Sequence, residues 1–372
     1  MSTNKKNRLK KRYLLYIFIV IIVFLGVFTS KTYNEEPMQV HNNNILPQYN
    51  SKTKLDIVSC YGDNEAYHPK VLSFKEKWNG YKYWMAYTPY PAGHESKENP
   101  HIMVSNNLID WKAPKGLINP LDDVNVIEEG TNTKKYNSDT HLIYNPDLDR
   151  IECYWRYVNN ITGEIIIYRR CSNDGVNFSN KEIFIKSNNK KIHDYVSPAI
   201  IYENGTYKMW YVDKRKIYYK EKKKEQDWTD AVVVPVEYDD NSLTTWHLDV
   251  IATKNGFEMI TVAYKDVKKR SSMSLYYSKS INETKDWETA TEILKPTIGT
   301  DYWDNRGLYR ACMIYENGVY IVFYSGISKN WDHGIGIVYG KDIKNLKSVN
   351  IDFFENKDTN TMLELIEKEK IK

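Results

Sequence analysis

Acidic side chains recur where predicted β-strands of this chain begin. Three carboxylates hold such positions, namely Asp139, Asp194 and Asp249. Carboxylates that converge on one pocket can act as an acid and a base when their surroundings push their pKa values apart. We therefore predict that two of these three residues are catalytic, and which of them is the acid stays open.

Histidine and arginine residues occur at the same strand starts. His68, His141 and His247 could donate hydrogen bonds to a ligand or tune the carboxylates. Arg306 and Arg310 predict an anionic group on the ligand, because a guanidinium binds such groups with two parallel hydrogen bonds. Each of these residues alone could instead be a turn residue or a cap, but the coincidence at five strand starts favours a shared site.

Tryptophan supplies candidate stacking surfaces for a ligand. Trp246 is one such candidate, and Trp303 is another because it lies in a loop-like, Asp-rich segment. For Trp84 and Trp155, a place in the hydrophobic core is the favoured interpretation. The chain has no H-E-x-x-H motif or comparable spacing, so we predict no catalytic metal. A structural Ca²⁺ is an expectation only by analogy with other proteins of the fold that the repeats predict. It also lacks a phosphate loop, a dinucleotide fingerprint and a G-x-S-x-G motif.

The elements that must position these residues form a repeat. An apolar strand is followed by a turn, a Tyr- and Trp-rich strand and a third strand, five times between residues 57 and 350. Asn-Gly marks the turn at Asn79, Asn204, Asn255 and Asn317, and an Asp-rich turn stands near Asp149. These turns are about 50 to 70 residues apart. Strand-rich units of that length, without helices, are typical of propeller blades with four antiparallel strands. We predict an all-β, five-bladed β-propeller, with two packed sandwiches as the competing architecture.

The N-terminus carries a membrane signal. Residues 1–12 contain six basic and no acidic residues, and an uncharged apolar stretch follows from Tyr13 to Phe28. We predict a cytoplasmic tail over 1–12, a transmembrane signal anchor over 13–30 and a polar tether over 31–56. The body then lies outside the cytoplasm, and a cleaved signal peptide that releases it is the alternative.

The net charge argues against a nucleic-acid partner. Of the 52 Lys and Arg residues, six lie in the N-terminal tail, which leaves 46 basic against 48 acidic residues in the remaining chain. A near-neutral body gives little electrostatic support for binding a phosphate backbone.

The propeller is predicted over 57–350 and a C-terminal tail over 351–372. Cys153 and Cys171 flank one turn, and either a disulfide or two buried thiols would fit.

Over residues 57–349 the sequence resembles the five-bladed β-propeller glycoside hydrolases of the arabinanase, levansucrase and invertase type, including glycoside hydrolase family 43. The resemblance rests on the blade count, the repeated Asn-Gly-x-Tyr and Ser-x-Asp-x-x-aromatic elements, and the stretch from Trp78 to Tyr90. It implies cleavage of a glycosidic bond by carboxylates from separate blades, and Asp139 matches the second-blade position. The chain departs from the pattern with His68-Pro69 in the first blade and with Asp194 but no Glu in the third.

These features together predict a membrane-anchored glycoside hydrolase outside the cytoplasm, acting on a surface or environmental polysaccharide. The departures leave two alternatives. One is a non-catalytic propeller for carbohydrate binding or polysaccharide assembly, and the other is a glycoside phosphorylase that holds phosphate with His and Arg.

Overall fold

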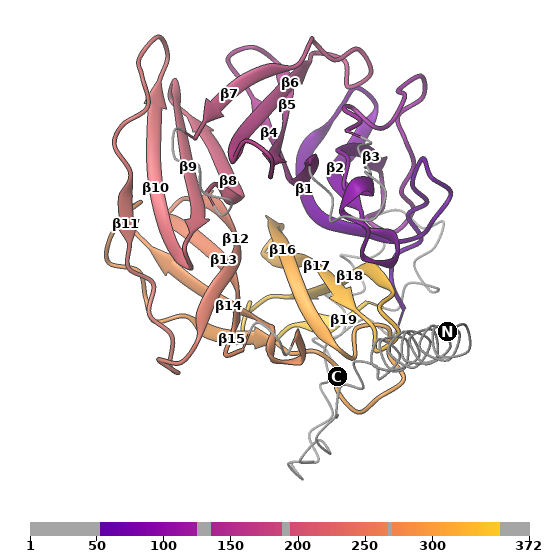
Figure 1. Ribbon diagram of the computed structural model, residues 1–372, viewed down its shortest axis with the longest axis vertical. Coiled ribbons are helices and arrows are strands. Elements are labelled where there is room, and N and C mark those ends of the chain that lie inside the picture. The colour runs from indigo at the N-terminus through magenta and orange to yellow at the C-terminus, as the bar shows by residue number, and fades with distance from the viewer. Residues whose placement is uncertain (1–52, 125–134, 188–193, 267–269, 350–372) are drawn as a thin grey trace, which may run out of the picture. The chain divides into compact units, whose positions relative to one another are not determined.

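The computed structural model describes residues 53–124, 135–187, 194–266 and 270–349. They belong to one compact unit, Leu46–Lys372, and form five antiparallel sheets of consecutive strands. Figure 1 shows these sheets arranged around a central axis, so this unit is an all-β five-bladed propeller, as the repeats predicted. The sandwich alternative is excluded, because the five sheets close into a ring.

Each blade begins with its innermost strand and ends at its outer edge. Blade 1 contains β1 (Ala66–Trp78), β2 (Tyr81–Pro89) and β3 (His101–Ser105), with the short 3-10 helices η1 (Pro91–Gly93) and η2 (Glu95–Lys97) before β3. Blade 2 contains β4 (Lys135–Asn145), β5 (Arg150–Asn159), β6 (Glu164–Ser172) and β7 (Glu182–Lys186). Blade 3 contains β8 (Val196–Glu203), β9 (Thr206–Asp213), β10 (Lys216–Lys223) and β11 (Val232–Val234).

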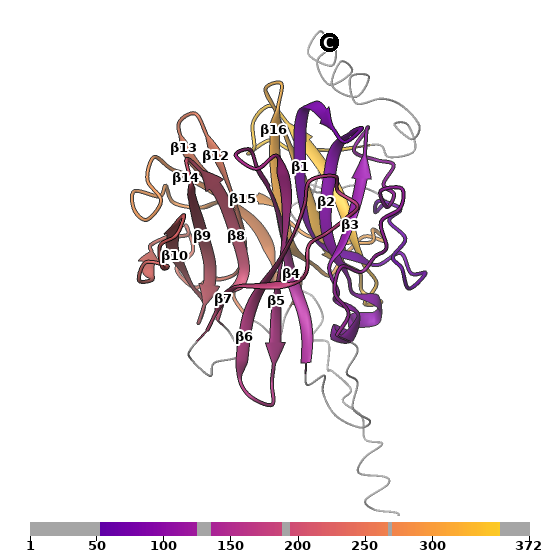
Figure 2. The same cartoon turned by 90° about the horizontal axis from the view of Figure 1, so that it is seen from above.

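Blades 4 and 5 complete the ring. Blade 4 contains β12 (Thr244–Thr253), β13 (Gly256–Tyr264), β14 (Ser274–Ser280) and β15 (Thr291–Leu294), with η3 (Arg270–Ser272) before β14. Blade 5 contains β16 (Gly307–Glu316), β17 (Val319–Ile327), β18 (His333–Gly340) and β19 (Lys347–Ser348). The five first strands contact one another in the cyclic order β1, β4, β8, β12, β16. Figure 2 shows β1, β4, β8 and β16 running along one common direction, so their starts meet at one end of the central channel.

The hydrophobic core consists mainly of layers between neighbouring blades. One cluster joins blades 1 and 2 through Trp84 and Leu142, and another joins blades 3 and 4 through Trp210 and Phe257. Trp84, Trp155 and Trp210 are completely buried, which agrees with the core interpretation of Trp84 and Trp155. A single sheet would leave these aromatic faces in water, so packing between blades supplies the burial that stabilises the fold.

The membrane prediction concerns residues that the structure does not describe. The proposed tail, anchor and most of the tether fall within residues 1–52, outside the described ranges. Among the described residues, none of the helices is long and apolar enough to cross a membrane. The two cysteines left open by the sequence, Cys153 and Cys171, are both buried free thiols.

Buried neutral histidines make the stability of the propeller depend on pH. His101 on β3 is fully buried, its Nδ1 lies 2.8 Å from the Asn99 carbonyl oxygen, and its Nε2 accepts a hydrogen bond from the Cys60 amide. One donor and one acceptor nitrogen describe a neutral imidazole. Burial, which disfavours the charged ring, lowers the pKa of His101 to about 4.

We expect the free energy of unfolding to fall as the pH falls below the pKa of an unfolded histidine. The unfolded state then binds a proton that the folded state excludes, so His101 alone should cost about 2 kcal/mol between pH 7 and pH 5. Urea titrations at both pH values test this expectation. His101→Gln should reduce the pH dependence, whereas the exposed His94→Gln should not. Equal pH dependence in the His101 variant and the unaltered protein would contradict it.

Candidate metal and active site

A β-bulge in the first strand of every blade turns side chains into the channel. The pairing register shifts at the same place in β1, β4, β8, β12 and β16. In the first three blades the bulged residue has a left-handed backbone, with φ of 53° at His68, 51° at Asp139 and 53° at Ser197. Such a conformation is costly for residues other than glycine, and it clusters at functional sites, where bulges re-aim side chains.

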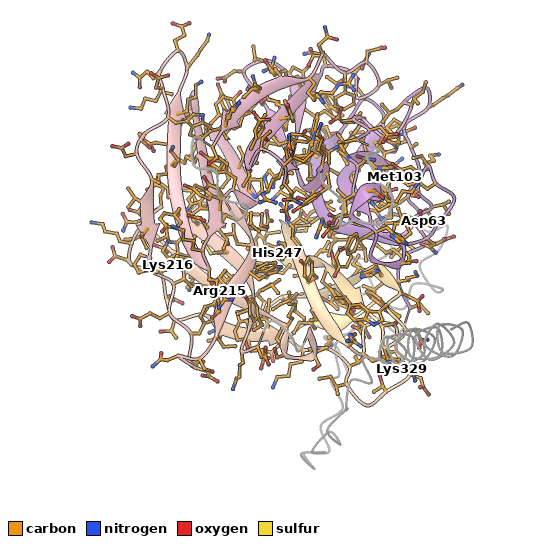
Figure 3. The ribbon with its side chains drawn as sticks, in the orientation of Figure 1. Asp63, Met103, Arg215, Lys216, His247 and Lys329 are labelled. Carbon is orange, nitrogen blue, oxygen red and sulfur yellow. The ribbon has the colours of Figure 1, made fainter. Side chains whose placement is uncertain are left out.

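Three of these side chains form a compact group. His68 of blade 1, Asp139 of blade 2 and His247 of blade 4 each offer one ligand atom, and these atoms lie within 4.8 Å of one another. All three residues are buried. Figure 3 shows His247 close to the central axis, where the first strands approach each other. The group therefore sits inside the channel and draws on three separate blades.

His68 is held with one ring nitrogen occupied and the other available. Its Nδ1 lies 3.1 Å from Thr88 Oγ1 and 3.5 Å from Glu98 Oε1. Its buried Nε2 has no hydrogen-bond partner among the described residues. Burial lowers the pKa of His68 well below the usual value, so the ring stays neutral. A neutral imidazole oriented by a second contact is the form that binds metal ions.

Asp139 is a buried carboxylate that stays ionised. Its Oδ1 lies 3.4 Å from His247 Nδ1 and 3.7 Å from Arg310 Nη1. Burial alone would raise its pKa, but the contact with His247 and the positive charge of Arg310 hold that pKa well below its usual range. Arg310 is itself completely buried, and its Nη2 donates to the Pro198 carbonyl oxygen at 3.3 Å. The buried guanidinium of Arg310 therefore lies beside Asp139 and compensates the negative charge of that carboxylate.

A second group of ionisable side chains lies two residues further along the same three strands. Lys70 Nζ donates to both carboxylate oxygens of Asp249, at 2.7 and 2.8 Å. His141 Nδ1 lies 3.8 Å from Asp249 Oδ1, while its Nε2 is 2.9 Å from the Ile200 carbonyl oxygen. Burial and the nearby Lys70 lower the pKa of His141, which keeps it neutral. The channel thus holds two charge-compensated carboxylates, Asp139 with Arg310 and Asp249 with Lys70.

The remaining predicted residues lie in different surroundings. Asp194 is buried, accepts from Ser187 Oγ at 2.5 Å and from the Tyr195 amide, and has no described contact with Asp139 or Asp249. Trp246 lies at the cluster, where its indole donates to Tyr309 Oη at 2.7 Å. The structure therefore brings together seven of the ten predicted residues, namely His68, Asp139, His141, Trp246, His247, Asp249 and Arg310.

The other two predicted residues belong to the periphery of blade 5. Trp303 stacks on Tyr324, with ring centroids 5.6 Å apart. The guanidinium of Arg306 lies 3.9 Å from the ring centroid of Trp331. Both residues precede β16, so they lie near the end of blade 5 at which its first strand starts.

The donor set fits a divalent cation. Two imidazoles and one carboxylate are the ligand types of many catalytic zinc sites, which leave a further position for water or substrate. His68 Nε2 and Asp139 Oδ1 are both buried without a hydrogen bond in the described part of the chain. A buried ring nitrogen such as His68 Nε2 is costly to leave without a partner, whereas Asp139 Oδ1 has only its longer contacts with His247 and Arg310. A shared cation would bind both atoms. The sequence did not predict this group because its ligands come from strands far apart in the chain.

Other neighbours of the group were also missed. Lys70 and Glu98 contact Asp249 and His68, and the Tyr309 ring lies 4.2 Å from that of His247. Lys70 follows His68 by two residues, but the bulge between them breaks the two-residue period of the strand, so the spacing alone could not have placed Lys70 in the channel. Glu98 comes from a loop between β2 and β3, and no periodic pattern marks it.

Comparison with known proteins identifies relatives of the fold. No family model matches the chain. The chain is 25% identical over 323 residues to an A type blood N-acetyl-α-D-galactosamine deacetylase of Flavonifractor plautii, covering 73% of this chain and 41% of that protein. The chain thus spans less than half of the length of this curated relative.

Solved structures show the same fold. An N-acetylgalactosamine deacetylase from F. plautii, in complex with blood group B trisaccharide, superposes with a TM-score of 0.69 at 21% identity, covering 84% of this chain and 98% of that one. A thermostable family-43 glycoside hydrolase has a TM-score of 0.50 at 14% identity, over 80% and 96% of the two chains. A mutant α-L-arabinanase of Cellvibrio cellulosa has a TM-score of 0.51 at 12% identity, over 78% and 96%. The five-bladed propeller resembling family 43 is thus confirmed as the fold.

Proposed function

We propose that this protein is a metal-dependent carbohydrate deacetylase that hydrolyses the acetamide of an N-acetylated amino sugar. The observation that carries the proposal is the buried group of His68, Asp139 and His247, which offers a zinc-type ligand set inside the central channel. The similarity to a protein named as an N-acetylgalactosamine deacetylase supports the same reaction class.

In this proposal His68, Asp139 and His247 hold the cation. A divalent ion with these ligands supplies Lewis-acid polarisation of the amide carbonyl and lowers the pKa of water. Water adds to the carbonyl carbon, the carbon–nitrogen bond breaks, and the amine leaves with a proton as acetate forms. Glu98 and Thr88 fix the orientation of the His68 ring through Nδ1, and Arg310 keeps Asp139 anionic.

Glycoside hydrolysis is the second candidate, because the fold is shared with family-43 enzymes and two carboxylates lie in one channel. This reaction needs one carboxyl group that remains protonated to act as the acid. Asp139 instead faces Arg310, whose positive charge holds the pKa of that carboxyl low, and both oxygens of Asp249 already accept hydrogen bonds from Lys70. The charge pattern therefore favours the deacetylase.

Product analysis separates the candidates. The full-length protein, incubated with zinc and either N-acetylgalactosamine or blood group A trisaccharide, should release acetate and a free amine without new reducing ends. Chelation of the metal should abolish the release. New reducing ends without acetate would instead identify a glycoside hydrolase, and a product that requires phosphate would identify a phosphorylase. Binding without any product would identify a carbohydrate-binding propeller.

We further propose that the propeller acts outside the cytoplasm while anchored by residues 13–30. Six cations before an uncharged apolar stretch support this orientation. The same acetate assay tests it: activity should sediment with washed membranes and be sensitive to protease added to intact cells. Activity recovered in the medium would indicate a cleaved signal peptide.

A further inference from the structure

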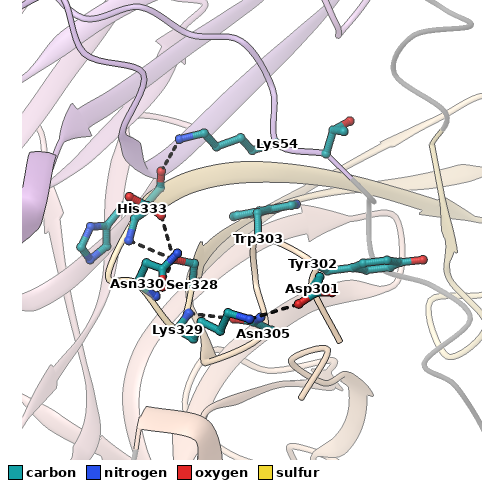
Figure 4. Close-up of a pocket in the computed structure, with 11 residues that line it drawn as sticks. Lys54, Asp301, Tyr302, Trp303, Asn305, Ser328, Lys329, Asn330 and His333 are labelled. Carbon is teal, nitrogen blue, oxygen red and sulfur yellow. Dashed lines mark hydrogen bonds and ion pairs between the residues drawn. The ribbon is translucent and has the colours of Figure 1, made fainter. Parts of the chain in front are cut away.

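A cavity on blade 5 lies at the end of that blade where its first strand, β16, starts. It has a volume of about 400 Å³ and lies between the segment before β16 and the loop that joins β17 to β18. Both connections lie at the end of the blade where β16 starts, and this is the end at which the metal ligands gather. Figure 4 shows Trp303 between Lys54 on one side and Lys329 and Asn305 on the other.

The cavity is linked to the candidate active site by packed rings. His333 lines the cavity, and its ring lies 4.9 Å from that of Tyr67. Tyr67 in turn lies 4.8 Å from the ring of His68. Only two ring contacts therefore separate the cavity wall from a proposed metal ligand, and the intervening Tyr67 is fully buried, so the two places are near neighbours in the fold.

The lining has the chemistry of a sugar site. Trp303 and Tyr302 provide aromatic surface, while the exposed Asn330 provides an amide that both donates and accepts hydrogen bonds. Sugar-sized pockets commonly combine apolar walls with a few fixed polar groups. The charged side chains of the lining are balanced, since Lys54 and Lys329 are matched by Asp301 and Asp332. This balance favours an uncharged ligand over a uronate or a phosphate.

The walls are held in place before any ligand binds. Trp303 stacks on Tyr324. It also packs closely against Gly326, because a Cβ atom added to that glycine would lie only 2.5 Å from Trp303 Cζ3. Asn305 accepts from the Lys329 amide at 2.7 Å and donates to the Thr300 carbonyl oxygen at 2.7 Å. Rigid walls lower the ordering cost of binding.

We propose that this cavity is a secondary subsite for a neutral sugar residue of the same glycan whose acetamide lies at His68, Asp139 and His247. The inference deepens the proposed function and rests on it for the identity of the first sugar. The protein thereby distinguishes an oligosaccharide from a single amino sugar, because only the longer ligand reaches Trp303.

The test is calorimetric binding of galactose, blood group B trisaccharide and cellotetraose, none of which carries an acetamide that could be hydrolysed, to the zinc-loaded, full-length protein. Trp303→Ala should weaken binding of at least one oligosaccharide by about tenfold, as expected for loss of an aromatic stack, and leave the monosaccharide unaffected. Trp303→Phe should restore part of the affinity. Since Trp303 also packs on Tyr324, the exposed Asn330→Ala provides a second variant that does not disturb the core.

Tyr315→Ala is the matched control, because this exposed tyrosine lies near the opposite end of β16. It should leave every affinity unchanged. Oligosaccharide binding that is unaffected by Trp303→Ala and Asn330→Ala would overturn the subsite, as would equal weakening for the monosaccharide or no oligosaccharide binding at all. Because binding is measured without turnover, absence of acetate release would count against the proposed reaction and not against the subsite.

Discussion

Asp139→Asn is expected to lower acetate release by about a thousandfold, because the substitution removes the only anionic ligand in the proposed metal group. An amide binds a divalent cation more weakly than a carboxylate, so the variant should also lose bound metal. Acetate release and metal content are measured on the same zinc-loaded preparations. The exposed Asp286→Asn in blade 4 is the control and should keep both.

Loss of activity in Asp139→Asn has to be separated from loss of the fold. The substitution leaves the buried Arg310 without its partner carboxylate, which by itself is destabilising. His247→Gln removes a ligand without removing that charge, so it should lose metal and activity while unfolding near the same urea concentration. Full activity with bound metal in either variant would contradict the site.

Lys70→Met is expected to destabilise the propeller by about 3–5 kcal/mol, because it leaves the Asp249 carboxylate buried without a cation. The two side chains are 7% and 1% exposed, so water cannot take the place of Lys70. Urea unfolding measures the change. The exposed pair of Lys279 and Glu288 provides the control, and Lys279→Met should leave the free energy of unfolding almost unchanged.

The double variant Lys70→Met/Asp249→Leu tests the cause of this loss. If the cost comes from an unpaired buried charge, removing both partners should recover most of the stability. A single variant within about 1 kcal/mol of the unaltered protein would contradict the assigned role of this pair. A double variant no more stable than the single one would show that packing of the lysine stem is what matters.

The fold was predictable because the repeat consists of short turns and strands that can each be recognised in the sequence. Asn-Gly turns such as Asn79-Gly80 and aromatic strands such as the one around Trp84 recur with a fixed order, and each blade needs its neighbours to bury these faces. Local patterns of this kind survive in one sequence without any alignment. Of the polar residues that the sequence analysis selected, His68, Asp139 and His247 lie close together in the structure.

The chemistry of the site was less predictable because it depends on pairing across blades. Asp139 and Asp249 look alike in the sequence, but Asp139 lies with His68, His247 and Arg310, whereas Asp249 accepts two hydrogen bonds from Lys70 and lies near His141. Asp194 precedes its strand, β8, whereas Asp139 and Asp249 lie inside theirs, and it has no described contact with either of them. Metal ligands that follow one another on a helix leave a spacing motif, whereas ligands delivered by three separate bulges do not.

The central claim is that His68, Asp139 and His247 jointly bind a catalytic cation. Anomalous X-ray diffraction at the zinc edge, from crystals of the zinc-loaded protein, tests it most directly. The account predicts one strong peak with bonds of about 2.0–2.2 Å to an imidazole nitrogen of each histidine and to a carboxylate oxygen of Asp139. An empty channel under these conditions, or a metal bound only elsewhere, would contradict it.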